Sequence, residues 1–112
     1  MSAPRRSFRG LDVTVYCSAP GFEQTPAIYK IAAEWLAGGT RELKTFGFAN
    51  DKCLETVFHE AAARAAKIAA EPGEEIGPIG VYRLLPNARD RDLERLRELE
   101  TKLRATPSPG GP

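Results

Sequence analysis

Alternating apolar and polar residues predict three strands in this chain. In residues 11–17 the apolar side chains fall on one face, and β-branched residues favour an extended backbone. Residues 42–48 carry apolar side chains on both faces, which is typical of a sheet covered on both sides. Within this strand, Gly47 indicates a close approach of another group to the backbone. The third strand lies within 76–85, where Pro78 favours the start of a strand or an edge position because proline cannot donate to a neighbouring strand.

Apolar residues at helical spacing predict three helices between and after these strands. The first covers residues 26–37, begins after Thr25 as its N-cap and ends at the pair of glycines that follows. The second and longest helix covers residues 54–68. The third carries a row of leucines and begins at a cap supplied by Asp90 or Asp92.

The order strand, helix, strand, helix, strand, helix predicts an α/β fold, β-α-β-α-β-α, with a small three-stranded, mostly parallel sheet. We expect a flexible N-terminal segment over residues 1–10, a single α/β domain over 11–105 and a disordered tail over 106–112. Because three strands make a small sheet, its edges are places that a partner chain can complete.

Composition and charge exclude several classes of protein. The chain has 112 residues, 42% of them hydrophobic and 28% charged, which is ordinary for one globular domain. Its 16 Lys and Arg residues nearly balance 15 Asp and Glu residues, so we expect binding neither to nucleic acid nor to a membrane surface. No apolar run has membrane-spanning length, and none follows the basic residues near the N-terminus. With only two cysteines, the sequence indicates a reduced, cytoplasmic protein.

Residues able to carry chemistry are few. A phosphatase-type loop needs an arginine six positions after its cysteine, but Glu23 stands there after Cys17. Two cysteines and the single histidine, His59, lie in separate predicted elements, so we expect no metal and no cofactor. His59 is predicted on the outward face of its helix. Cys53 is the one weak catalytic candidate, because the first turn of a helix favours a thiolate. The alternative is that both cysteines are small buried side chains.

Residues 15–21, VYCSAPG, and the predicted helix after them resemble the opening of the glutaredoxin branch of the thioredoxin-like fold. In that family a two-cysteine motif opens the helix, whereas residues 22–25, FEQT, stand in its place here. Residues 77–82, GPIGVY, are similar to the segment that carries the family's cis-proline. The resemblance covers residues 11–103 and implies a member without redox activity, since dithiol exchange needs a resolving cysteine. The chain departs from the family pattern because it has no clear fourth strand.

Two loops predict a binding site at one edge of the sheet. In a parallel α/β sheet, ligands bind beyond the carboxyl ends of the strands, where loops 17–25 and 49–53 would lie. Each loop leads into a helix N-terminus, whose free N–H groups favour an anion. The candidate binding residues are Ser18, Gly21, Thr25, Asn50 and Asp51. The alternative for Thr25, Asn50 and Asp51 is that they only cap helices.

Clear signals of a fold without a catalytic set favour a small, non-catalytic interaction or assembly module that forms homo-oligomers. Its partner would then be another protein or a second copy of the chain. The alternative is a thiol-dependent enzyme or a small-anion-binding protein that uses the two loops, with Cys53 as the thiolate.

Overall fold

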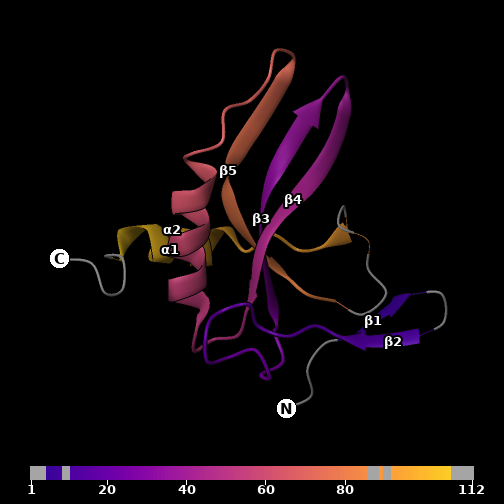
Figure 1. The fold of residues 1–112 in the computed structure, drawn as a ribbon, viewed down its shortest axis with the longest axis vertical. Helices are drawn as coiled ribbons and strands as arrows, with labels where there is room; N and C mark the ends of the chain where they lie inside the picture. Colours follow the sequence, from indigo (N-terminus) through magenta and orange to yellow (C-terminus); the bar gives the residue numbers. More distant parts are fainter. Residues whose placement is uncertain (1–4, 9–10, 86–88, 90–91, 107–112) are drawn as a thin grey trace.

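The computed structural model describes residues 5–8, 11–85, 89 and 92–106, which form two antiparallel sheets and two helices (Figure 1). A small hairpin pairs β1 (Arg5–Phe8) with β2 (Leu11–Thr14). The main sheet has the strand order β4-β3-β5. Its strands are β3 (Tyr29–Ala37), β4 (Thr40–Ala49) and β5 (Glu74–Arg83), and the helices are α1 (Leu54–Ala65) and α2 (Arg97–Ala105).

The predicted mostly parallel β-α-β-α-β-α fold is wrong, because the main sheet is antiparallel throughout and the described chain has two helices. The decisive error concerns residues 26–37, predicted as a helix and found as the central strand β3. Ile31, Ala32 and Ala33 in this strand are completely buried. A strand that is apolar on both faces also satisfies the helical spacing rule, so the periodicity of so short a run does not distinguish the two structures.

Gly38 and Gly39 form a hairpin turn and not the end of a helix. Their φ angles are 56° and 86°, and the residues on either side, Ala37 and Thr40, are paired across β3 and β4. A two-residue turn with positive φ at both central positions matches the right-handed twist of the strands. Glycine is favoured at a helix C-terminus for the same conformational reason, which is why this pair of residues is ambiguous in the sequence.

The strand predicted over residues 11–17 is found only as β2 and pairs with β1, outside the main sheet, so its place in the predicted sheet was wrong. The other elements are present with changed bounds. The helix predicted from residue 54 is confirmed as α1, and the edge position of Pro78 is confirmed because β5 is an edge strand. The last helix begins at Arg97, after Asp92, and Asp90 lies outside the described residues. The segment before α2 is extended instead: the N–H of Leu96 donates to the carbonyl of Val81 in β5 at 2.8 Å.

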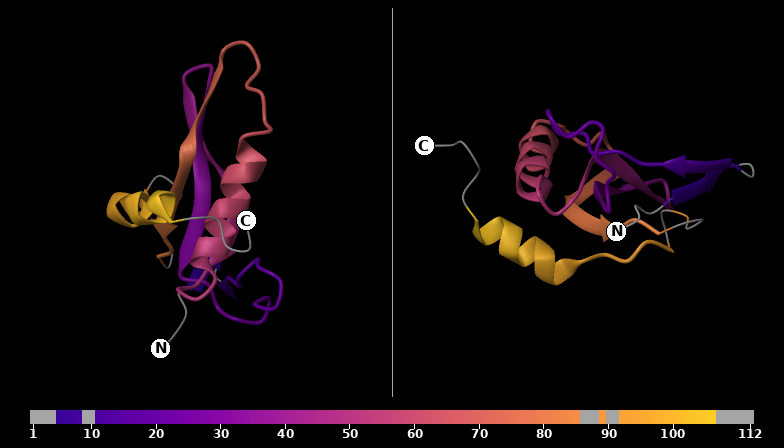
Figure 2. Two further views of the ribbon diagram at one scale, coloured as in Figure 1. Left: turned by 90° about the vertical axis from the view of Figure 1, so that its left-hand side faces the viewer. Right: turned by 90° about the horizontal axis from the view of Figure 1, so that it is seen from below.

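Both faces of the main sheet are covered, as the apolar pattern of residues 42–48 predicted. The helix α1 covers one face, and α2 lies against β5, where its Leu103 joins the core on the α1 side (Figure 2). The larger core lies on the side of α1 and includes Val57, Phe58 and Ile31. A smaller cluster on the other face contains Ala32 and Tyr82, together with Leu93 from the segment before α2 and the half-buried Leu43.

The predictions for the two ends of the chain and for the family resemblance can also be compared with the structure. β1 lies within residues 1–10, where we expected a flexible segment without an element. The tail expected at 106–112 lies outside the described residues except for Thr106. Among the described residues no peptide bond is cis, including the one before Pro78. Together with the antiparallel sheet, this bond gives no support to the thioredoxin-like resemblance.

Candidate functional site

The two predicted loops do meet at the base of the main sheet. The N–H of Ser18 donates to the carbonyl of Phe48 at 3.0 Å, and the N–H of Phe48 donates to Ser18 Oγ at the same distance. In the first loop, the N–H of Gly21 donates to the Glu23 carboxylate at 3.0 Å. Thr25 is not a helix cap, because no helix follows it, and its carbonyl accepts the N–H of Cys17 at 2.9 Å.

The polar side chains of the second loop are likewise bonded to the protein. Asn50 Oδ1 accepts the N–H groups of Lys52 and Cys53 at 2.9 and 3.0 Å, which holds the turn that leads into α1. Asp51 accepts a hydrogen bond of 2.6 Å from the hydroxyl of Tyr29. The five predicted residues therefore gather at one end of the sheet and bond mainly to neighbouring protein groups. Anion binding by them stays a prediction.

The two cysteines lie next to each other beneath these loops. Cys17 and Cys53 are free thiols and are 3% and 2% exposed. The N–H of Asn50 points to Cys53 Sγ at 3.4 Å. Burial, followed by the neighbouring Cys53 thiol, raises the pKa of Cys17 to about 11. A thiol in this state is protonated at neutral pH, so Cys17 is not a nucleophile there.

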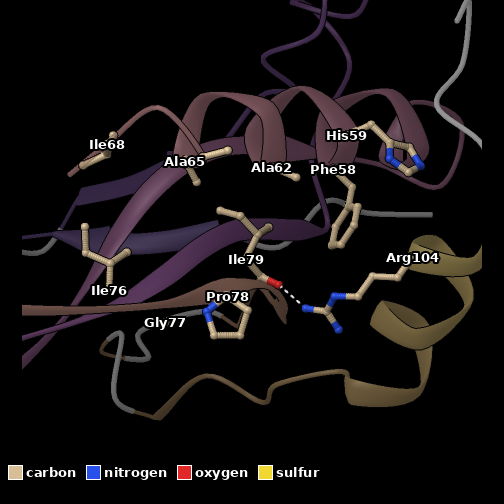
Figure 3. Close-up of a pocket in the computed structure, with 11 residues that line it drawn as sticks. Phe58, His59, Ala62, Ala65, Ile68, Ile76, Gly77, Pro78, Ile79 and Arg104 are labelled. Carbon is tan, nitrogen blue, oxygen red and sulfur yellow. Dashed lines mark hydrogen bonds between the residues drawn. The ribbon is translucent and has the colours of Figure 1, made fainter. Parts of the chain in front are cut away.

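A groove that the sequence did not indicate runs between α1, β5 and the C-terminal end of α2 (Figure 3). Its volume is about 560 Å³. Most of the lining is small or apolar: α1 and the residues after it supply Phe58, Ala62, Ala65, Ala66 and Ile68, and β5 supplies Ile76, Gly77, Pro78 and Ile79. The groove therefore offers apolar surface with room for another backbone to come close.

Two polar side chains, His59 and Arg104, lie at one end of this groove, opposite Ile68 and Ile76 (Figure 3). The His59 ring meets Phe58 edge-on, with ring centroids 5.6 Å apart, and its Nε2 atom is buried without a hydrogen-bond partner among the described residues. Arg104 lies over the Phe58 ring, with its Cζ 5.8 Å from the ring centroid.

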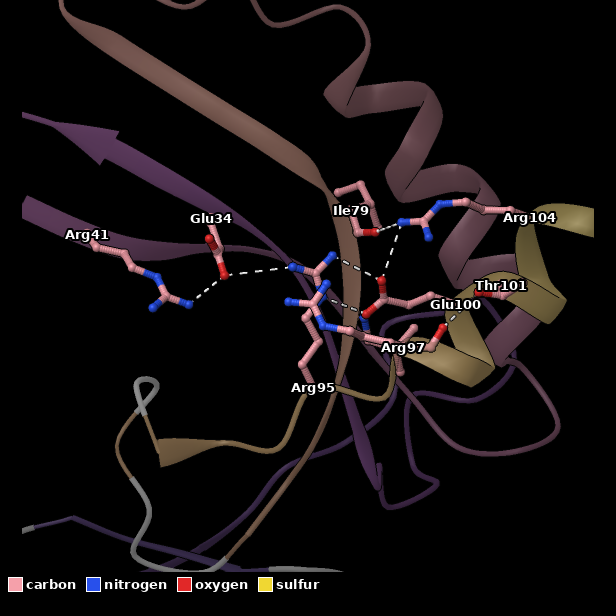
Figure 4. A network of polar contacts seen from close by, with 9 residues as sticks. Glu34, Arg41, Ile79, Arg95, Arg97, Glu100, Thr101 and Arg104 are labelled. Carbon is pink, nitrogen blue, oxygen red and sulfur yellow. Dashed lines mark hydrogen bonds and ion pairs between the residues drawn. The ribbon is translucent and has the colours of Figure 1, made fainter.

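Arg104 is held in place by the attachment of α2 to the edge of β5 (Figure 4). Its Nη2 donates to the carbonyl of Ile79 at 2.6 Å. Glu100, one turn earlier, is 1% exposed and accepts hydrogen bonds from the N–H of Val81 and from Arg95. Burial opposes the charged form of Glu100, but these hydrogen bonds and the nearby positive charges outweigh it and lower the pKa of the carboxyl.

The groove was not predicted, because the apolar pattern of α1 marks one buried face only. His59 was predicted to point outward, and it is instead half-buried, with its ring against Phe58. A signal was present in the spacing of His59, Ala62 and Ala66, which follow one another by three and four residues on one side of the helix. Small residues in such a row leave space for another chain.

Comparison of the chain with protein-family models, with curated proteins and with solved structures finds no match in any of the three. Among the described residues, no group of three or more His, Cys, Asp or Glu side chains is arranged to hold a metal ion. No helix in that part of the chain is long and apolar enough to cross a membrane.

Proposed function

We propose that this protein is a non-catalytic interaction module that holds an apolar segment of a partner protein in the groove between α1, β5 and α2. The observation that supports this is the groove itself, with its volume of about 560 Å³ and its small and apolar lining. Removing apolar surface from water supplies the driving force, and the alanines let a partner's backbone come close. The two free thiols suit a reducing compartment, so the proposal places the protein in the cytoplasm.

The proposal includes self-association through an edge of the main sheet. In the described part of the chain, residues 40–45 of β4 have no neighbouring strand on their outer side. Such an edge can pair with the same edge of a second copy. Light scattering over a range of concentrations should give a mass of at least two chains. A mass of one chain at all concentrations would remove self-association and leave the groove proposal untouched.

The alternative, a thiol-dependent enzyme or an anion-binding protein, has less support. Cys53 is 2% exposed, so a substrate cannot reach its sulfur without movement of the surrounding chain. The carboxylate of Asp51 also lies in the loop proposed to hold an anion, where its negative charge disfavours one.

Selection from a library of random peptides displayed on phage tests the groove. Ala66→Arg places a long charged side chain at the groove, and Ala63→Arg makes the same change at an exposed alanine of α1 that does not line it. Peptides with an apolar run should be enriched on the unmodified protein and on Ala63→Arg, and lost on Ala66→Arg. Equal recovery on all three proteins, or no enrichment at all, would contradict the proposed function.

A further inference from the structure

The shape of the groove suits a short extended peptide. From Phe58 to Ala66 the helical wall rises about 12 Å, and β5 advances about 10 Å from Ile76 to Ile79. An extended chain advances about 3.3 Å per residue, so the groove spans about four residues. Sites for small ligands generally enclose most of the ligand surface. This groove is open to solvent, which suits a segment that remains attached to a larger protein.

One positive charge is left over at the end of the groove. Three arginines and two glutamates form one network of ion pairs: Arg41, Arg95, Arg104, Glu34 and Glu100 (Figure 4). Arg95 contacts both carboxylate oxygens of Glu100, at 2.9 and 3.0 Å, whereas Arg104 Nη2 is 3.4 Å from the nearer one. Arg95 therefore neutralises most of the charge on Glu100, and the surplus charge lies on Arg104, whose side chain is 44% exposed.

Arg104 has N–H donors at this end of the groove that the hydrogen bonds described above do not use. The contacts of Arg104 with the described residues use Nη2, and a guanidinium carries five N–H donors. The helix α2 stands at this end of the groove (Figure 3).

We infer that the groove binds the free C-terminal end of a partner protein. About four apolar residues of the partner lie between α1 and β5, and its terminal carboxylate accepts hydrogen bonds from Arg104. A carboxylate matches the surplus charge of the guanidinium, and charge-assisted hydrogen bonds of this kind are strong. A chain end suits this site better than a continuing chain, because α2 stands where the next residues would run. This inference rests on the proposed function.

The test compares two forms of one fluorescent peptide of four apolar residues, with a free C-terminal carboxylate or with a C-terminal amide. We expect the carboxylate form to bind the unmodified protein at least about tenfold more tightly. Arg104→Gln should abolish this preference. Arg97→Gln removes the same charge from an exposed position of α2 away from the groove and should preserve it. The comparison on the unmodified protein needs no variant, so it remains decisive if Arg104→Gln fails to fold.

Each outcome separates this inference from the proposed function. Equal affinity for the two forms, or binding of neither while the phage selection still recovers apolar peptides, would overturn the C-terminal assignment and leave the interaction module intact. Decanoate that binds more tightly than the peptide and displaces it would assign the groove to a fatty acid. A phage selection that recovers nothing would remove the groove as a protein-binding site altogether.

Discussion

Gly47 is the residue with the least room for a side chain at the junction of the two loops. A Cβ there would lie 2.8 Å from Val57 Cγ1 and 2.9 Å from Ser18 Oγ. We expect Gly47→Ala to lower the free energy of unfolding by about 1–3 kcal/mol, since the packed neighbours must move. Gly77→Ala is the control, because its Cβ would meet Glu34 at an ordinary 3.6 Å. Urea unfolding measures both, and equal effects would contradict this account of Gly47.

The buried thiol of Cys17 and the buried hydroxyl of Tyr29 predict a loss of stability in alkali. Burial first, and the neighbouring Cys53 second, raise the pKa of Cys17 from 9.0 to about 11. Burial and the hydrogen bond to Asp51 likewise raise the pKa of Tyr29 from 10.0 to about 12. An acid whose pKa is higher in the folded protein contributes fully to stability at pH values below its pKa in the unfolded protein. That contribution is lost as the pH rises through its pKa in the folded protein.

For Cys17 this loss amounts to about 2 kcal/mol between about pH 8 and about pH 10.5. Urea unfolding at these two pH values measures it. In Cys17→Ala the free energy of unfolding should fall less between them than in the unmodified protein, whatever the substitution does to stability at pH 8. A fall of the same size in both proteins would show that Cys17 does not contribute to the loss of stability in alkali.

At the scale of elements, the attachment of α2 to the edge of β5 depends on Glu100. This carboxylate is buried and joins Arg95 of the preceding segment to the N–H of Val81. Glu100→Gln removes the nearest carboxylate from Arg95, which keeps only Glu34 at 3.7 Å, and we expect a loss of about 2–4 kcal/mol in the free energy of unfolding. Glu98→Gln, at an exposed position of the same helix, should change it by less than about 0.5 kcal/mol.

The same carboxylate predicts the response to acid. Because its folded pKa lies below the ordinary value of 4.5, the contribution of Glu100 is complete above that pH and declines as the pH falls further. The unfolding curves of the unmodified protein and of Glu100→Gln should therefore converge on acidification. A constant difference between them down to about pH 2.5 would contradict the ion-pair explanation.

The elements differ in how well their sequences specify them. α1 was predictable because apolar residues recur on one face over its whole length, from Leu54 to Ala65, with helix-forming alanines between them. β3 was not, because the central strand is buried on both faces and shows no alternation. Its two glycines are equally favourable in a hairpin turn and after a helix. Replacing one helix by a strand turned a parallel sheet into an antiparallel one.

At the scale of the whole molecule, the burial of both thiols predicts slow chemistry. Cys17 and Cys53 are 3% and 2% exposed, so an alkylating reagent reaches them only when the surrounding structure opens. In native buffer both should react much more slowly than in concentrated urea, as followed by mass spectrometry. The single-cysteine variants Cys17→Ser and Cys53→Ser separate the two rates. Rapid native reaction of Cys53 would restore the thiol-dependent enzyme as the better proposal.

The local features of the candidate site could be predicted from the sequence, whereas the groove could not. Residues near one another in the chain were placed well: the turn formed by Asn50 before α1 and the close approach at Gly47 both follow from local rules. The groove was beyond those rules, since His59 and Arg104 are 45 positions apart in the chain. Their common location depends on how α2 attaches to β5, through a buried carboxylate that the sequence presents as one acidic residue among many.

The sequence by itself determined the features that depend on neighbouring residues: α1, the strands β4 and β5, the edge position of Pro78 and an interior covered on both faces of the sheet. Only the tertiary structure decided that residues 29–37 are a strand, because hydrogen bonds to strands on both sides favour an extended backbone over a helix that the local pattern allows equally. It also decided where the groove lies, because long-range contacts attach α2 at the edge of β5 and bring Arg104 beside Phe58.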